Sequence, residues 1–141
     1  MKQIKSTISV VLLIICLFSL VACGNSVDKT GLWENATYTE DTQLGEGTKT
    51  AIVQVKAEEQ IITFTLKTDK DTVGDALFEN KLIDGEESEY GLYVKVVNGI
   101  TADYDKDKSY WAFYVDGEYA TSGVDTTKIA EGVTYQLAYT K

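Results

Sequence analysis

The sequence contains no histidine, no proline and no arginine, and only two of its 141 residues are cysteines. Without histidine, the chain lacks the commonest general base and zinc ligand, and Ser-His and Cys-His nucleophilic pairs are excluded. Without arginine, it lacks the planar guanidinium group that binds phosphate or carboxylate through two hydrogen bonds. Neither a glycine-rich phosphate loop nor a serine-nucleophile motif occurs in the sequence. These absences predict that the protein is not an enzyme.

The charge balance is strongly acidic, with 22 Asp and Glu residues against 13 basic residues and a formal net charge of −9. Nucleic acid, a polyanion, is repelled by this charge and is therefore not an expected partner. The first 22 residues hold two of the lysines and no acidic residue, so their removal changes the net charge to −11.

The first 23 residues have the layout of a secretory signal. Two lysines form a basic head, an apolar run follows from Ile8 to Leu20, and the segment closes on Leu20-Val21-Ala22-Cys23. The run is too short and wrongly flanked for a membrane-spanning helix. Its ending resembles the bacterial lipobox, in which the cysteine is acylated and becomes the first residue after cleavage. This predicts a lipoprotein signal peptide over 1–22, a lipidated Cys23 and anchoring on the extracellular face of the cell membrane. The alternative is an ordinary signal peptide with an incidental cysteine.

Under this prediction neither cysteine can form a disulfide. Cys16 leaves with the signal, and the sulfur of Cys23 is joined to lipid. The folded domain then depends on its hydrophobic core, which a chain of about 119 residues can supply.

Residues 23–49 are rich in small polar and acidic residues and show little periodicity. This composition predicts the lipidated cysteine followed by a flexible tether. Trp33 and Tyr38 are the large aromatic residues of this segment. These residues either dock on the domain, as part of an extra edge strand, or contact the lipid interface. Docking is favoured because exposed aromatic rings are costly in water.

Residues 50–141 are predicted to form one α+β domain. Apolar and polar residues alternate with a period of two in six segments, which predicts strands over 51–56, 62–67, 92–96, 100–104, 110–115 and 133–139. Asn98-Gly99 and Asp116-Gly117 are two-residue turn signals between such strands.

A single helix is predicted from Thr72 to about Lys81. Thr72 and Asp75 have the spacing of a capping box, and Val73 and Leu77 lie on the side that would pack on the sheet. The expected architecture is a mixed sheet with one packed helix.

Four segments carry a family resemblance. They are Thr72-Val73-Gly74-Asp75-Ala76-Leu77, Tyr110-Trp111-Ala112-Phe113-Tyr114-Val115-Asp116-Gly117, Gly123-Val124-Asp125 and Glu131-Gly132-Val133-Thr134-Tyr135. Together they resemble the transcobalamin C-terminal-like family, known as the DUF4430 domain. In that family an early helix precedes a Tyr-Trp hairpin, a Gly-Val segment and an acidic-Gly turn into a last aromatic strand. Asp116 stands where the family has Asn, and both residues suit this turn.

The resemblance implies a β-grasp-like fold. In the vitamin B12 carriers this domain covers one face of the corrinoid, and a larger α-helical domain holds the other face. The present chain shows neither that helical domain nor a histidine to ligate cobalt. The resemblance therefore implies that this domain covers one face of cobalamin or another corrinoid, as one half of a clamp. Another protein would then supply the other half.

The candidate ligand-binding residues surround the Tyr-Trp motif and are Tyr110, Trp111, Tyr114, Tyr119 and Tyr93. The alternation of residues along this segment is consistent with Trp111 and Phe113 packing in the core and with the tyrosines lying on a different face. An exposed tyrosine cluster there would stack on a flat ligand or a sugar ring. The ordinary preference of tyrosine for sheets explains the same residues without a ligand.

Asp103, Asp105 and Asp107 have the alternating spacing of a calcium loop. However, Lys108 and Tyr114 stand where the EF-hand pattern requires Gly and Glu. A solvated, charged loop is expected here, as for the acidic run 84–89, and no metal site is predicted.

These features predict a membrane-anchored extracellular lipoprotein with a non-enzymatic ligand-binding domain, suited to the capture of a corrinoid or another nutrient. Its expected partners are the membrane, through the anchor, and a small molecule or a partner protein such as a transporter. The alternative is a surface adhesion or protein-interaction module.

Overall fold

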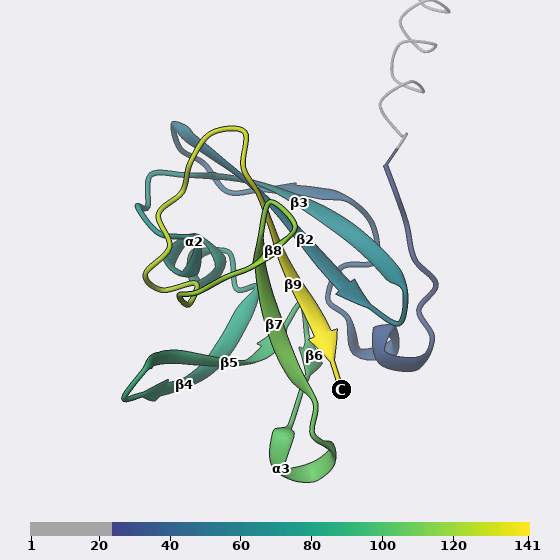
Figure 1. Ribbon diagram of the computed structural model, residues 1–141. Helices are drawn as coiled ribbons and strands as arrows, with labels where there is room; N and C mark the ends of the chain where they lie inside the picture. Colours follow the sequence, from purple (N-terminus) through teal and green to yellow (C-terminus); the bar gives the residue numbers. More distant parts are fainter. Residues whose placement is uncertain (1–23) are drawn as a thin grey trace, which may run out of the picture.

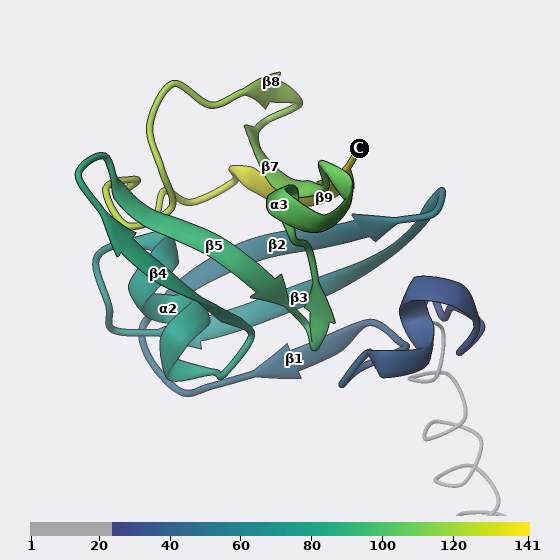
Figure 2. The same cartoon turned by 90° about the horizontal axis from the view of Figure 1, so that it is seen from below.

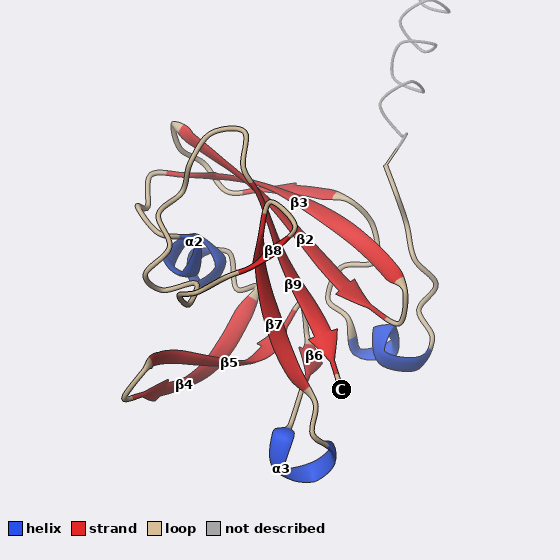
Figure 3. Cartoon of the chain, viewed as in Figure 1, coloured by secondary structure: helices blue, strands red, loops and turns tan. Residues whose placement is uncertain are grey.

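Two β-sheets and three short helices make up residues 24–141, the part of the chain that the computed structural model describes (Figures 1 and 3). The larger sheet contains β1 (Thr42–Leu44), β2 (Lys49–Ala57), β3 (Gln60–Thr68), β7 (Tyr110–Val115), β8 (Glu118–Tyr119) and β9 (Thr134–Thr140). The smaller sheet contains β4 (Ile83–Ser88), β5 (Gly91–Val97) and β6 (Ile100–Thr101). The helices are η1 (Gly31–Asn35), α2 (Val73–Glu79) and α3 (Tyr104–Asp107). None of these helices is long and apolar enough to cross a membrane. The predicted signal peptide over 1–22 and Cys23 lie outside the described residues.

The larger sheet has a β-grasp arrangement at its centre. Its strands follow the order β1-β3-β2-β9-β7-β8. β2 and β3 form an antiparallel hairpin, β9 runs parallel to β2, and β7 runs antiparallel to β9. Helix α2 lies across one face of this sheet (Figure 2). The predicted α+β architecture, a mixed sheet with one packed helix, is confirmed.

The hydrophobic core lies between α2 and the inner face of the larger sheet. Along β2 and β3 every second residue is buried, and Val53 lies opposite Phe64. β9 adds Tyr135 and Leu137 to this face, because Tyr135 is the register partner of Val53. The alternate residues of the same strands form the outer face of the sheet.

Helix α2 begins where the sequence predicts. The Thr72 hydroxyl accepts a hydrogen bond from the Asp75 main-chain N–H at 3.2 Å, so it satisfies one of the free donors of the first turn. Leu77 is fully buried against the sheet. The helix ends at Glu79, two residues earlier than predicted, and Lys81 already has a positive φ of 57°.

The smaller sheet is a hairpin extended by a short third strand. The predicted turn at Asn98-Gly99 is present, with both residues at positive φ. β6 ends at Thr101 and does not continue to Tyr104, because Asp103 accepts two main-chain N–H groups and caps α3. β4 was not predicted, since its residues are mostly polar and its register shifts at Asp84-Gly85.

Residues 24–49 pack against the larger sheet, where the sequence predicts a flexible tether. Trp33 is fully buried in η1, and its Nε1 donates to the Ala57 carbonyl at 2.9 Å. The Tyr38 ring meets Phe64 edge-on, with ring centroids 5.5 Å apart. Both aromatic residues therefore dock on the domain, although the added edge strand is β1, which lies after both of them and pairs parallel to β3. Burial of these rings offsets the polar composition of the segment.

Asn98 connects this N-terminal segment to the smaller sheet. Its side-chain oxygen accepts from the Tyr38 N–H at 2.9 Å, and its side-chain nitrogen donates to the Tyr38 carbonyl at 2.8 Å. Its main-chain N–H donates to the Leu82 carbonyl, and its carbonyl accepts from Thr37. Asn98 is fully buried, so all of these groups are satisfied within the protein.

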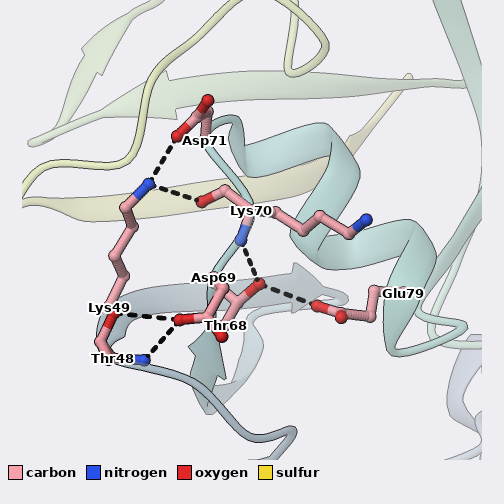
Figure 4. A network of polar contacts seen from close by, with 7 residues as sticks. All are labelled: Thr48, Lys49, Thr68, Asp69, Lys70, Asp71 and Glu79. Atoms are coloured by element: carbon pink, nitrogen blue, oxygen red, sulfur yellow. Dashed lines mark hydrogen bonds and ion pairs between the residues drawn. The ribbon is translucent and has the colours of Figure 1, made fainter.

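A polar network joins the start of β2, the end of β3 and α2 (Figure 4). Its members are Thr48, Lys49, Thr68, Asp69, Lys70, Asp71 and Glu79. Lys49 Nζ lies 2.6 Å from Asp71 Oδ1, and the Thr68 hydroxyl donates to Glu79 at 2.8 Å. The network holds the hairpin and the helix together at one end of the sheet.

Candidate functional site

The outer face of the larger sheet carries the candidate site. On β7 the residues Tyr110, Ala112 and Tyr114 point outward, because the alternating residues Trp111 and Phe113 belong to the core. Helix α2 packs on the opposite face of the sheet (Figure 2), and the outward side chains of Tyr110 and Tyr114 are partly exposed.

Tyr114 and Tyr119 form an aromatic pair on this face. They are register partners on β7 and β8, and their rings meet edge-on with centroids 5.5 Å apart. Tyr119 is 62% exposed, so the pair presents ring surface to solvent. The intervening Asp116-Gly117 turn is pinned to β9, since Asp116 Oδ1 accepts the Thr134 N–H at 2.8 Å. The pair is thus held by a fixed hairpin.

A hollow of about 380 Å³ lies beside the tyrosine pair. Its lining includes Lys56, Glu58, Glu59, Tyr114, Gln136 and Ala138. Ala138 lies opposite Ala112 across β9 and β7. Both alanines are buried, and Ala138 lines the hollow.

The polar groups of the hollow are held in place by the sheet. Gln136 Nε2 donates to Gln54 Oε1 at 3.1 Å across the parallel strands β9 and β2. Lys56, on the same face of β2, brings a positive charge, and Glu58 and Glu59 in the β2–β3 turn bring negative charges. The site thus combines an aromatic wall, amide groups and charges of both signs.

Three of the five predicted binding residues share this face. Tyr114 and Tyr119 are in contact, and Tyr110 lies on the same side of β7. Tyr110 is four residues from Tyr114, which corresponds to roughly 13 Å along an extended strand. Tyr110 is therefore at the far end of the face and does not join the pair.

Trp111 and Tyr93 lie elsewhere. Trp111 is only 7% exposed and packs edge-on against Tyr139 in the core, which is the packing interpretation that the sequence allowed. Its Nε1 is buried and has no hydrogen-bond partner within residues 24–141. Tyr93 belongs to β5 of the smaller sheet, where its ring lies 6.0 Å from Lys95 Nζ. The prediction of one shared tyrosine face is wrong for Tyr93.

Sequence reasoning missed Gln54, Lys56, Gln136 and Ala138. All four occupy the outward positions of β2 and β9, so the period-two pattern contained the signal. What the pattern could not show is that these two strands, about 80 residues apart in sequence, lie side by side and parallel.

The acidic residues around α3 have structural roles, and Asp107 also pairs with Lys141 at 3.4 Å. Asp103 caps the helix, and Asp107 accepts hydrogen bonds from the main chain and hydroxyl of Ser109. Within residues 24–141 no group of three or more His, Cys, Asp or Glu side chains is arranged to hold a metal ion.

The perturbed ionisable groups lie outside the hollow. Hydrogen bonds from Thr48 lower the pKa of Asp69, a hydrogen bond from Lys49 lowers the pKa of Asp71, and Ser109 lowers the pKa of Asp107. A hydrogen bond to Glu86 raises the pKa of Lys95. Each shift favours the charged form, as expected for structural ion pairs and caps and not for a general acid or base tuned to neutral pH.

Several solved structures are similar to this chain, and they include a protein from Ruminococcus gnavus and haptocorrin. A protein from Ruminococcus gnavus ATCC 29149, provisionally described as metal-binding, is 29% identical with a TM-score of 0.63, and the match covers 67% of this chain and 98% of that one. Haptocorrin in complex with cobinamide (Cbi) is 19% identical with a TM-score of 0.54, and the match covers 66% of this chain. This chain spans only 25% of haptocorrin, and the likeness shows the fold alone. No curated protein matches the chain in sequence.

The family comparison agrees with the motifs. The model described as "Domain of unknown function (DUF4430)" matches residues 70–141. The matched part includes α2, the Tyr-Trp strand β7 and the last strand β9, while the β2–β3 hairpin precedes it. Since this match spans just over half of the chain and the predicted fold is present, the chain belongs to the DUF4430 family.

Proposed function

We propose that this chain is a non-enzymatic binding protein whose outer sheet face takes a flat ligand of the corrinoid class. The observation that carries the proposal is the Tyr114–Tyr119 pair, with Tyr119 exposed and Tyr114 half-buried, beside the hollow over β2 and β9. In the proposal, the lipid on Cys23 holds the protein on the extracellular face of the cell membrane, where such a nutrient is captured.

The chemistry of the face suits a corrinoid. Aromatic rings stack on flat conjugated systems, and a corrin ring offers such a surface. Corrinoids also carry amide groups around the ring, which match the donors and acceptors of Gln54, Gln136 and Lys56. Cobinamide is a cation, and the formal net charge of −11 that the chain has after removal of residues 1–22 attracts it.

The size of the hollow supports a half-clamp. A volume of about 380 Å³ is near the lower end for pockets that enclose a small molecule. The face therefore covers one side of a corrinoid and leaves the other side free. A second protein, such as a transporter, completes the site in this proposal, and the isolated domain binds weakly.

Calorimetric titration of residues 24–141 with cobinamide tests the proposal. Stacking on one aromatic ring is worth roughly 1–3 kcal/mol, so Tyr114→Ala and Tyr119→Ala are each expected to weaken binding by about 5- to 140-fold. Tyr90→Ala is the matched control, because Tyr90 is 96% exposed in the β4–β5 turn of the other sheet. Absence of saturable binding would refute the proposed ligand, and an equal loss in the control would refute the proposed site.

One observation favours the alternative of a protein-interaction module. β4 forms an edge of the smaller sheet, and the β4–β5 hairpin projects from the body with Tyr90 at its tip (Figure 1). Free edge strands are sites where a partner can add a strand. In that case Tyr90→Ala would reduce capture of the partner, and Tyr119→Ala would not.

A further inference from the structure

The chain is attached to the larger sheet from the second described residue onward. The Asn25 main-chain N–H donates to Asp41 Oδ2 at 3.0 Å, and the Asp41 N–H donates back to the Asn25 carbonyl at 2.8 Å. The Asn25 side chain donates to the Ile61 carbonyl of β3 at 2.6 Å. Three hydrogen bonds thus hold this one residue in place.

The following residues continue the attachment. Ser26 forms a β-bridge with Glu40, and the Val27 N–H donates to the Thr39 carbonyl at 2.8 Å. Asp41 Oδ1 accepts the Thr63 N–H at 2.7 Å, so the same carboxylate ties the segment to β3. The start of the described chain is therefore an integral part of the β1–β3 edge.

This attachment leaves almost no slack between the domain and Cys23. Two residues span at most about 7 Å of extended chain, and Cys23 is two residues before Asn25. A flexible tether over residues 24–49 would instead reach roughly 28 Å. The difference decides whether a lipid on Cys23 holds the domain loosely or at a fixed distance.

We propose that the β1–β3 edge of the larger sheet, around residues 25–28, 39–41 and 60–63, faces the lipid bilayer in a fixed orientation. This inference rests on the lipidation of Cys23 in the proposed function. Figures 1 and 2 both place the start of the described chain on the β1–β3 side of the molecule. β8 lies four strand spacings from β3, which is about 19 Å, so the Tyr114–Tyr119 pair is presented on the edge away from the bilayer.

The charges near the anchor explain why the acyl chains are needed. Asp28, Glu40 and Asp41 lie in the attached segments, and Glu58 accepts the Leu32 N–H beside them. Acidic side chains are repelled by anionic lipid, so this edge does not bind the bilayer by charge. The acyl chains supply the affinity, and the short link sets the orientation.

Fluorescence quenching in vesicles tests the orientation. The full chain is expressed with its signal, purified in acylated form and reconstituted in phosphatidylcholine vesicles that carry a nitroxide on the lipid headgroup. Glu40→Cys and Glu118→Cys form a matched pair: both residues are exposed glutamates, one beside the anchor and one on β8. Because Cys16 leaves with the signal and Cys23 is a thioether, each engineered thiol takes a single fluorophore.

The fluorophore at position 40 is expected to be quenched at least threefold more than the fluorophore at position 118. Inserting 26 Gly and Ser residues between Gly24 and Asn25 is expected to remove the difference. Equal quenching in acylated protein without the insertion, or a difference that survives the insertion, would overturn the orientation. A mass measurement that finds Cys23 without acyl chains would instead refute the anchor in the proposed function.

Discussion

Asn98 shows how one side chain can hold two parts of this fold together. As the first residue of a tight turn it has a φ of 51°, which asparagine tolerates better than most residues. At the same time it makes two side-chain hydrogen bonds to the main chain of Tyr38. Turn formation and attachment of the N-terminal segment thus depend on the same buried amide.

Replacing this amide should therefore be costly. Asn98→Ala leaves both main-chain groups of Tyr38 without their partners and puts alanine at positive φ, and we expect a loss of about 2–4 kcal/mol in the free energy of unfolding. Urea denaturation of residues 24–141 measures this loss. Asn35→Ala, at an exposed position of the same N-terminal segment, should change stability by less than about 0.5 kcal/mol. Equal effects of the two changes would contradict the account of Asn98.

At the scale of elements, η1 and β1 behave as part of the domain. The ring of Trp33 is fully buried and hydrogen-bonded to Ala57 at the end of β2, and β1 adds a parallel strand beyond β3. The segment therefore covers the edge of the β2–β3 hairpin. Its deletion would expose that edge as well as part of the core.

Trp33→Ala tests this role of the N-terminal segment. Loss of a fully buried tryptophan typically costs about 3–5 kcal/mol, whereas the same change in a solvated tether would cost nothing. Glu34→Ala on the exposed side of η1 is the control and should be nearly neutral. A neutral Trp33→Ala in thermal or urea unfolding would show that the segment does not contribute to the folded core.

The network at the end of β3 predicts a dependence of stability on pH. The pKa values of Asp69 and Asp71 lie below the ordinary value of 3.8, so the folded state favours their ionised forms. Their contribution is present above that value and is lost as the pH falls through the lower pKa of the folded state.

Asp71→Asn should therefore flatten the acid side of the stability profile. The variant is expected to be slightly less stable than the parent at neutral pH and equally stable near about pH 2, because protonation removes the ion pair with Lys49 in the parent. Urea midpoints measured between about pH 2 and 7 follow the effect. Glu87→Gln on β4 is the control, and an unchanged dependence of stability on pH in Asp71→Asn would rule out the Lys49–Asp71 ion pair as a cause of that dependence.

The elements that the sequence predicts well are those with a clear period or turn signal. The β2–β3 hairpin, α2 with its Thr72 cap, and the Asn98-Gly99 turn follow from local patterns. β4 could not be predicted, because its polar residues form a strand only through pairing with β5. The N-terminal segment could not be predicted to pack, because its composition is polar and its contacts are with β2, β3 and Asn98, far along the chain.

The candidate site was predicted only in part, for the same reason. Alternation along β7 separates the outward Tyr114 from the inward Trp111. The hollow also needs Lys56 and Gln136, which become neighbours only through the parallel pairing of β2 with β9. Local patterns report the face of a strand but not which distant strand lies beside it.

At the scale of the whole molecule, the two edges of the larger sheet carry different features. The β1–β3 edge holds the start of the described chain, and the β7–β8 edge carries the tyrosine pair. In the proposed orientation, a short lipid anchor at the first edge would make the second edge point away from the membrane. A partner protein that completes a corrinoid site would then approach the side of the domain that faces away from the bilayer. A membrane-bound partner would have to extend well above the bilayer to reach this side.

In the proposed function, the outer sheet face around Tyr114 and Tyr119 binds a corrinoid. Nuclear magnetic resonance of ¹⁵N-labelled residues 24–141 during addition of cobinamide tests this binding. We expect saturable shifts in the main-chain amides of β7, β8, β9 and the end of β2, with the β4–β5 hairpin unchanged. Shifts confined to the smaller sheet, or none at millimolar cobinamide, would contradict it.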